Sequence, residues 1–152
     1  KYHSVAGFEG ADVLSENILE VECDVLIPAA VGGVITTSNV NKIRAHVIVE
    51  AANSPTTVSA DKILKDNNVL VIPDILANAG GVTASYFEWV QNRQNYLWKE
   101  KDLYEKLIDT MTSAFEEVWT ISQKNKCDLR TAALIKGIKR VAAAKLTRGL
   151  FP

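Results

Sequence analysis

The sequence predicts an α/β fold in which about three parallel strands are joined by crossover helices and followed by further helices. The strands are predicted from three short apolar runs, which lie at residues 24–28, 46–50 and 69–73. The centre of each run is continuously apolar and rich in β-branched residues, a pattern typical of strands buried on both faces of a parallel sheet. The helices are predicted from the segments between these runs and from the second half of the chain.

Two helical segments are predicted between the strands, at residues 37–44 and 57–66. The first has weak helical character, whereas the second places Ile63 and Leu64 on one apolar face. Crossovers between parallel neighbours are right-handed, so all three strands should end at the same edge of the sheet. The segments that follow the strands should therefore converge.

These three strand-end segments share one character. Residues 28–33, 50–56 and 74–81 combine small side chains with a few amides. Open α/β sheets bind ligands at this edge, where small residues let a flat ligand approach the backbone and Asn offers a donor and an acceptor. Ala, Gly, Asn and Pro are also common in ordinary turns. Because all three segments share the pattern, we predict a cofactor cleft.

Helices are predicted to fill the second half of the chain. Residues 82–95 and 103–121 have helical patterns, and in the second the apolar residues recur at close to helical spacing. A last helix is predicted over residues 129–146, with Asp128 as its N-cap and Gly149 as its stop. The chain is therefore expected to end as two long helices.

The composition is that of one globular unit and excludes several classes of function. Of 152 residues, 47% are apolar and 23% charged, and the formal net charge of -1 gives no field that attracts nucleic acid. No apolar stretch approaches the roughly 20 residues of a membrane span. Cys23, Cys127, His3 and His46 are isolated, so no disulfide framework, metal site or nucleophilic triad is predicted. We expect a protein of the cytoplasm or of an organelle matrix.

A longer motif carries a resemblance to a known family. Residues 76–92, LANAGGVTASYFEWVQN, strongly resemble the signature of the glutamate dehydrogenase family, which includes the leucine, phenylalanine and valine dehydrogenases. Three further segments support this in order, namely CDVLIPAA at residues 23–30, VIVEAANSPTT at 47–57 and LRTAALIKGIKRVA at 129–142, with RGLFP at the end. The EAAN and GGVIT forms look like those of the plant and cyanobacterial branch.

The resemblance implies a partial Rossmann-like sheet that binds NAD or NADP. Residues 1–80 would be the C-terminal half of the cofactor domain, and residues 81–152 a helical segment that packs on the sheet. A chain that opens at Lys1 without Met is expected to be a fragment, and the GxGxxG turn and the catalytic lysines of the family are not among its residues. We therefore predict that this chain alone is inactive.

The resemblance also implies cofactor-binding residues. Asn78 would contact the nicotinamide side or its ribose, although its side chain could instead cap the turn at Gly80 and Gly81. Those two glycines would leave room for a stacked ring, or could be needed for a left-handed or strained backbone. Asn53 would lie beside the nicotinamide ribose, or could be a turn residue ahead of Pro55.

Three further residues complete the predicted site. Ala29 and Ala30 resemble positions that pass the adenosine ribose by their backbone. Ser85 lies early in the helix predicted from residue 82, where a serine of the family binds the side-chain carboxylate of glutamate. Ser85 could also be a solvated serine near a helix start. Because leucine-type relatives carry an apolar residue here, Ser85 favours glutamate.

The complete protein is thus predicted to convert L-glutamate to 2-oxoglutarate and ammonia, as a hexamer, with hydride transfer to nicotinamide. Tyr86, Phe87 and Trp89 are predicted to anchor the helices to the sheet, and Arg130 to pair with an acidic residue of a preceding domain. The alternative function is a non-catalytic nucleotide-binding or oligomerisation module derived from the family. Such a module would associate to hide the sheet edge and apolar faces that half a cofactor domain exposes.

Overall fold

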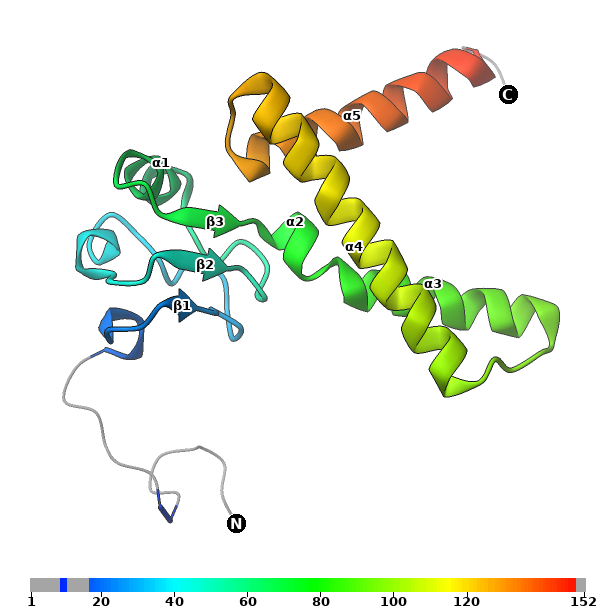
Figure 1. The fold of residues 1–152 in the computed structure, drawn as a ribbon, viewed down its shortest axis with the longest axis horizontal. Helices are drawn as coiled ribbons and strands as arrows, with labels where there is room; N and C mark the ends of the chain where they lie inside the picture. Colours follow the sequence, from blue (N-terminus) through cyan, green and yellow to red (C-terminus); the bar gives the residue numbers. More distant parts are fainter. Residues whose placement is uncertain (1–8, 11–16, 150–152) are drawn as a thin grey trace.

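The structure, a computed structural model, describes residues 9–10 and 17–149. Figure 1 shows a small sheet with long helices that extend away from it. Within the described residues the elements follow the order η1, β1, η2, β2, α1, β3, α2, α3, α4 and α5. The predicted fold class, an α/β fold with a parallel sheet followed by C-terminal helices, is confirmed.

The sheet contains three parallel strands in the order β1, β2, β3. Their bounds are Val25–Leu26 for β1, Val47–Val49 for β2 and Leu70–Ile72 for β3. Each strand lies inside its predicted apolar run. Val47 of the central strand pairs with Val25 on one side and with Leu70 on the other, so all three strands end at the same edge.

The prediction that the strands are buried on both faces is wrong for this chain. Leu26 and Ile48 are buried on one face, whereas Val25, Ile27 and Leu70 are 48%, 57% and 40% exposed. Successive side chains of a strand point to opposite faces. Only one face of the sheet is therefore fully covered by the described part of the chain.

Helix α1 (Val58–Asp66) joins β2 to β3 as predicted. Thr57 is its N-cap, with Oγ1 accepting a hydrogen bond from the backbone N–H of Ala60 at 3.4 Å. Ala60 and Leu64 are buried on the side that faces the sheet. The apolar spacing and the threonine cap thus determine both the start of this helix and its buried face.

The helix predicted over residues 37–44 is only a short 3-10 turn, η2 (Val40–Lys42). Asn39 accounts for the difference, because its Oδ1 accepts the N–H of Thr36 and its Nδ2 donates to the carbonyl of Val34, both at 2.8 Å. Side-chain bonds of this kind satisfy backbone groups locally and compete with a helix.

A first core lies on the covered face of the sheet. Its buried members are Leu26, Ile35, Val40, Ala45, Ile48, Ala60 and Leu64, and Leu19 of η1 (Ile18–Glu20) packs against them. Ile35 and Ile48 have no exposed surface, and burying one such side chain contributes about 1.5–3 kcal/mol. This core fixes the carboxyl ends of the strands relative to one another.

The chain is helical almost immediately after β3. A short helix α2 (Asp74–Ala77) and Asn78 lead into α3 (Ala79–Gln94), so the helix predicted from residue 82 begins three residues earlier. The left-handed backbone considered for Gly80 and Gly81 is wrong, since among the described glycines only Gly10, Gly33 and Gly149 have positive φ.

Two long helices close the fold as predicted. They are α4 (Glu100–Asn125) and α5 (Leu129–Arg148). A second core joins them to the sheet through the buried Leu76, Val118, Leu129 and Ala132, and Ile72 of β3 packs against it. The division proposed at residue 80 falls inside α3, and it stays a prediction.

The start of α5 is held by a side-chain cap. Asp128 Oδ1 accepts the N–H of Thr131 at 2.8 Å, and Asp128 Oδ2 accepts from Thr131 Oγ1 and from Lys65 Nζ, both at 3.1 Å. We expect Asp128→Ala to lower the free energy of unfolding by about 1 kcal/mol, the usual cost of losing an N-cap. Guanidinium denaturation of both chains measures the difference.

Asp128→Asn is the matched control, because asparagine caps as well as aspartate but carries no charge. Burial raises the pKa of Asp128, but the hydrogen bonds from Thr131 and Lys65 outweigh burial and hold that pKa below its ordinary value. The charged contribution is therefore complete above about pH 4 and lost as pH falls through the lowered pKa. An alanine variant as stable as the asparagine variant at pH 7 contradicts the capping role.

The aromatic residues of α3 differ from the prediction. Phe87 is buried beside Trp98, with ring centroids 5.6 Å apart. Tyr86 and Trp89 are 58% and 57% exposed, and they stack on each other at 5.9 Å. The prediction that they anchor the helices to the sheet is wrong for Tyr86 and Trp89, because α3 packs mainly against α4.

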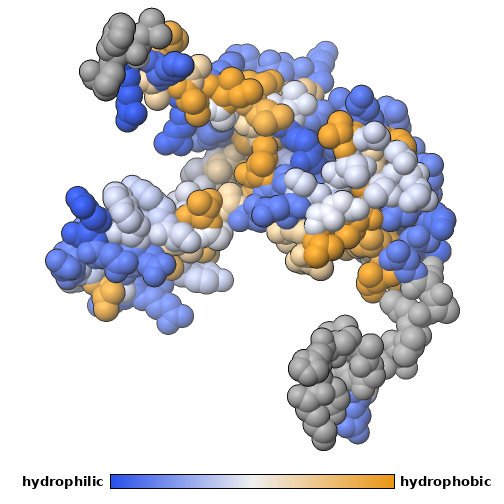
Figure 2. Space-filling view, turned by 180° about the vertical axis from the view of Figure 1, so that it is seen from behind, coloured by the Kyte–Doolittle hydropathy of each residue, from blue (hydrophilic) through white to orange (hydrophobic). Residues whose placement is uncertain are grey.

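Exposed apolar side chains gather along α5 beyond its first turns. Leu134, Ile138, Val141 and Leu146 are between 50% and 84% exposed. Figure 2 shows hydrophobic residues among charged ones along this helix. Surfaces of this kind are typical of contacts with other domains or subunits. No described helix combines the length and apolar character that a membrane span requires.

Candidate functional site

The three segments that follow the strands meet at one edge of the sheet, here called the carboxyl edge (residues 27–33, 50–57 and 73–78). The N–H of Ala52 donates to the carbonyl of Pro28, and the N–H of Gly33 to the carbonyl of Ser54, both at 2.8 Å. The third segment joins through Asp74, whose Oδ2 accepts the N–H of Ser54 at 2.7 Å. The predicted convergence is confirmed.

Asn53 and Asn78, both predicted to bind cofactor, contact each other at the carboxyl edge. Asn78 Nδ2 donates to Asn53 Oδ1 at 2.7 Å and to the carbonyl of Ala51 at 3.4 Å. Asn78 does not cap α3 with its side chain, so the capping alternative is wrong. Among the described residues, Asn53 Nδ2 and Asn78 Oδ1 have no hydrogen-bond partner and remain available as a donor and an acceptor.

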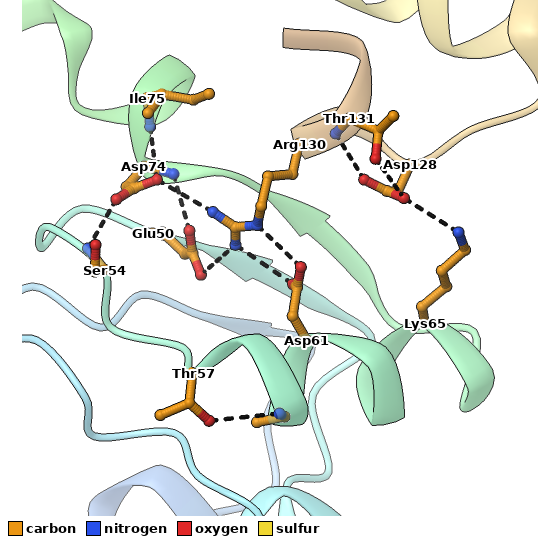
Figure 3. Close-up of polar contacts among 11 residues, drawn as sticks. Glu50, Ser54, Thr57, Asp61, Lys65, Asp74, Ile75, Asp128, Arg130 and Thr131 are labelled. Atoms are coloured by element: carbon orange, nitrogen blue, oxygen red, sulfur yellow. Dashed lines mark hydrogen bonds and ion pairs between the residues drawn. The ribbon is translucent and has the colours of Figure 1, made fainter. Parts of the chain in front are cut away.

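A charge cluster lies next to the turn that carries Asn53, because its member Asp74 accepts the N–H of Ser54. It consists of Glu50, Asp61, Asp74 and Arg130 (Figure 3). The guanidinium contacts Glu50 Oε1 through Nη2 at 2.8 Å, Asp61 Oδ2 through Nε at 3.0 Å and Asp74 Oδ1 through Nη1 at 3.2 Å. One planar donor group therefore ties together the end of β2, helix α1 and the start of α2.

The charge cluster is largely shielded from water. Glu50 has no exposed surface and the Arg130 side chain is 25% exposed. Burial alone would lower the pKa of Arg130, but hydrogen bonds to Asp61 and Glu50 outweigh burial and raise that pKa above its ordinary value. The guanidinium thus stays charged around neutral pH, and it serves as the counter-ion of the three carboxylates.

The pairing of Arg130 corrects the prediction from the sequence. Arg130 was expected to pair with an acidic residue of a preceding domain, and instead it pairs with three acidic residues of this chain. The reason is geometric, because Asp128 starts α5 beside β3 and α1. The long arginine side chain then reaches the strand ends.

Gly32 lets two segments of the carboxyl edge approach closely. A Cβ at this position would lie 2.9 Å from the carbonyl oxygen of Asn53 and 3.3 Å from that of Ser54. Any side chain at position 32 would therefore displace the turn that carries Asn53. In the sequence Gly32 belongs to the small-residue segment 28–33 and to the GGVIT form at residues 32–36, but neither pattern predicts this close approach.

Gly80, Gly81 and Ser85 lie on α3. A Cβ at Gly80 would contact Met111 and Leu107 of α4 at 3.9 and 4.0 Å, whereas a Cβ at Gly81 would meet nothing within 4 Å. Asn78, Gly81 and Ser85 are spaced by three and four residues, so they share one helix face. Ser85 is exposed and lies in the second turn of α3.

Ala29 and Ala30 are exposed in the segment after β1. A groove of about 640 Å³ lies between α4 and α5, away from these residues, and is lined by Val118 and Leu134 among others. In the described part of the chain, no cluster of three His, Cys, Asp or Glu could hold a metal ion.

Comparison with known proteins decides the family. The sequence profile of the glutamate/leucine/phenylalanine/valine dehydrogenases matches residues 1–149. The chain belongs to this dehydrogenase family. It is 50% identical to the catabolic NAD-specific glutamate dehydrogenase RocG of Bacillus subtilis over 137 residues, which cover 90% of this chain and 32% of that protein. It is 48% identical to the NAD-specific glutamate dehydrogenase of Staphylococcus aureus strain COL, covering 90% and 33%.

Solved dehydrogenase structures have the same fold. The hetero-hexameric glutamate dehydrogenase of Thermus thermophilus, in its Leu-bound form, superposes with a TM-score of 0.86 at 30% identity, over 89% of this chain and 32% of that one. The Peptoniphilus asaccharolyticus glutamate dehydrogenase gives 0.77 at 39% identity, over 82% and 32%. The chain thus spans about a third of the length of the curated relatives it matches. Its resemblance to the plant and cyanobacterial branch stays a prediction.

Sequence reasoning missed the charge cluster of this dehydrogenase chain. Glu50 and Asp74 each follow an apolar strand within one or two residues. A charged residue at that place is seldom fully buried unless it is paired. The position of Glu50 and Asp74 was therefore a signal for a buried cation, although nothing in the sequence identified Arg130 as that cation.

Proposed function

We propose that this chain is the C-terminal part of the cofactor domain, with the closing helices, of an NAD-dependent glutamate dehydrogenase. The observation that carries the proposal is the amide pair of Asn53 and Asn78 at the carboxyl edge. Parallel α/β sheets bind nucleotides at this edge. The NAD specificity named for relatives at 48% and 50% identity supports NAD over NADP.

The residues present fit a nicotinamide cofactor. Asn53 and Asn78 together offer the donor and the acceptor that a carboxamide or a ribose requires. The open space beside Gly81 leaves α3 accessible along the face it shares with Asn78 and Ser85. Ala29 and Ala30 add only small side chains to the edge. When bound, the cofactor accepts a hydride from the α-carbon of the amino acid.

Ser85 is proposed to bind the substrate. Its exposed hydroxyl lies on the same helix face as Asn78, about two turns further along α3. A hydroxyl there can donate to the side-chain carboxylate of glutamate, which an aliphatic amino acid lacks. The products of the complete protein are then 2-oxoglutarate, ammonia and the reduced cofactor.

The test uses the complete protein, because the chain spans about a third of its relatives. We expect amino-acid-dependent reduction of NAD, followed at the absorbance of the reduced cofactor, with kcat/KM higher for glutamate than for leucine, phenylalanine or valine. NADP is expected to be the poorer cofactor. Preference for an aliphatic amino acid contradicts the proposed substrate, and failure to reduce NAD or NADP with any of the four contradicts the proposed enzyme.

A second candidate function is a non-catalytic oligomerisation module, which the exposed apolar residues of α5 and of the sheet favour. These surfaces suit either function, since a complete dehydrogenase is also proposed to be a hexamer. Sedimentation separates the two. A hexamer that turns over supports the enzyme, whereas an assembly of the short chain alone that does not turn over supports the module.

A further inference from the structure

The turn that carries Asn53 has a strained backbone. Ser54 has φ of 47°, in the left-handed region that a non-glycine residue adopts at a cost. Such conformations persist where the surroundings hold them. Here the N–H of Ser54 donates to Asp74 Oδ2 at 2.7 Å, a hydrogen bond to a charged acceptor. The conformation of the turn therefore depends on the position of the Asp74 carboxylate.

Asp74 is itself held by three further hydrogen bonds. Its Oδ1 accepts from Nη1 of Arg130 at 3.2 Å and from the N–H of Ile75 at 2.8 Å, and its backbone N–H donates to Glu50 Oε2 at 2.9 Å. Asp74 is 8% exposed, so water does not compete freely for it. Figure 3 shows the guanidinium between Glu50 and Asp61, with Asp74 linking it to Ser54.

We propose that Arg130, on the last helix, is a positioning residue for the cofactor-binding amides of the carboxyl edge. It acts through Asp74, which holds the left-handed turn at Ser54 and so keeps Asn53 in contact with Asn78. This inference rests on the proposed function, and it extends the site from the strand ends to α5.

The charges explain why an arginine is needed at this place. Without the guanidinium, the carboxylates of Glu50 and Asp74 would lie close together in a shielded environment and repel each other. The Asp74 side chain would then turn away and release the Ser54 N–H. Asp61 contacts the same guanidinium through Nε at 3.0 Å but contacts neither Asp74 nor Ser54. It lies in the charge cluster and outside the path to Asn53.

That difference supplies a matched pair of variants in the complete protein. Asp74→Asn and Asp61→Asn each remove one carboxylate charge from Arg130. We expect the dissociation constant for NAD to rise about tenfold for Asp74→Asn, which corresponds to about 1.4 kcal/mol, and less than twofold for Asp61→Asn. The KM for NAD should rise while kcat at saturating NAD changes little, because the amides position the cofactor.

A second pair tests the turn without touching any charge. Ser54→Val and Asn68→Val each place a β-branched residue at positive φ, since Asn68 has φ of 58° in the turn between α1 and β3. Both should lower the melting temperature by similar amounts. Only Ser54→Val should weaken NAD binding, because Asn68 lies at the opposite end of the sheet.

The outcomes separate this inference from the proposed function. A wild-type protein that binds no NAD overturns both. A wild-type protein that binds NAD, with equal changes for Asp74→Asn and Asp61→Asn, overturns the positioning role alone. If Asp74→Asn does not fold, the valine pair decides, and unchanged NAD binding by Ser54→Val overturns the role.

Discussion

Replacing Arg130 by methionine is expected to lower the free energy of unfolding by about 3–5 kcal/mol, because it leaves buried carboxylates without their counter-ion. Glu50 has no exposed surface, and Asp74 is 11% exposed in its side chain. Methionine keeps much of the aliphatic bulk, so the loss of charge and hydrogen bonds dominates. The raised pKa of Arg130 means that the arginine does not titrate between pH 5 and 9. Guanidinium denaturation measures the loss.

Two further substitutions make this measurement specific. Arg130→Lys keeps the charge but not the planar fork that reaches three carboxylates, so we expect a smaller loss than with methionine. Arg140→Met removes an exposed arginine from the same helix and should change stability by less than about 0.5 kcal/mol. Equal stability of the two methionine variants would mean that desolvation cancels the gain from the ion pairs.

Replacing Ser85 by alanine in the complete protein is expected to reduce kcat/KM for glutamate by about one to two decades. A hydrogen bond to a charged group contributes about 1.5–3 kcal/mol, and alanine leaves the substrate carboxylate without this donor. Leucine cannot make the bond, so its kcat/KM should stay unchanged or rise. The ratio of the two kcat/KM values is therefore the quantity to measure.

Ser59→Ala provides the control for that ratio, because Ser59 is an exposed serine in the first turn of α1. Its removal should leave both substrates unaffected. An equal loss for glutamate and leucine in Ser85→Ala would indicate a general structural effect. An unchanged ratio would remove Ser85 from the substrate site.

The sequence predicted the strands and helices correctly where a local pattern, such as an apolar run or a helix cap, determines the structure. The three apolar runs contain β1, β2 and β3, the predicted range 57–66 contains α1, and the predicted Asp128 cap marks the start of α5. The helix prediction failed at residues 37–44, because the side-chain bonds of Asn39 compete with helix formation. The prediction that the strands are buried on both faces also failed, since an apolar run does not reveal which face of the sheet another element covers.

The sequence likewise predicted one part of the site and not another. Right-handed crossovers alone placed the three strand-end segments together, and the Asn53–Asn78 contact bears out that placement. The burial of Glu50 and the route from Arg130 to Asn53 join residues up to 80 positions apart. Neither hydrophobic periodicity nor motif spacing predicts a contact between residues so far apart in the sequence.

By itself the sequence determined the order of the strands and helices, the cap of the last helix and the family of the chain, because these depend on local patterns and on motifs read in order. The tertiary structure decided which charges meet, which glycine is sterically required and which aromatic residues are exposed. These three features depend on how α4 and α5 lie against the sheet. The position of each helix is set by contacts between side chains that are far apart in the sequence. Arg130 shows both contributions. The sequence predicted the helix that carries it, and only the tertiary structure brings the strand ends within reach of its side chain.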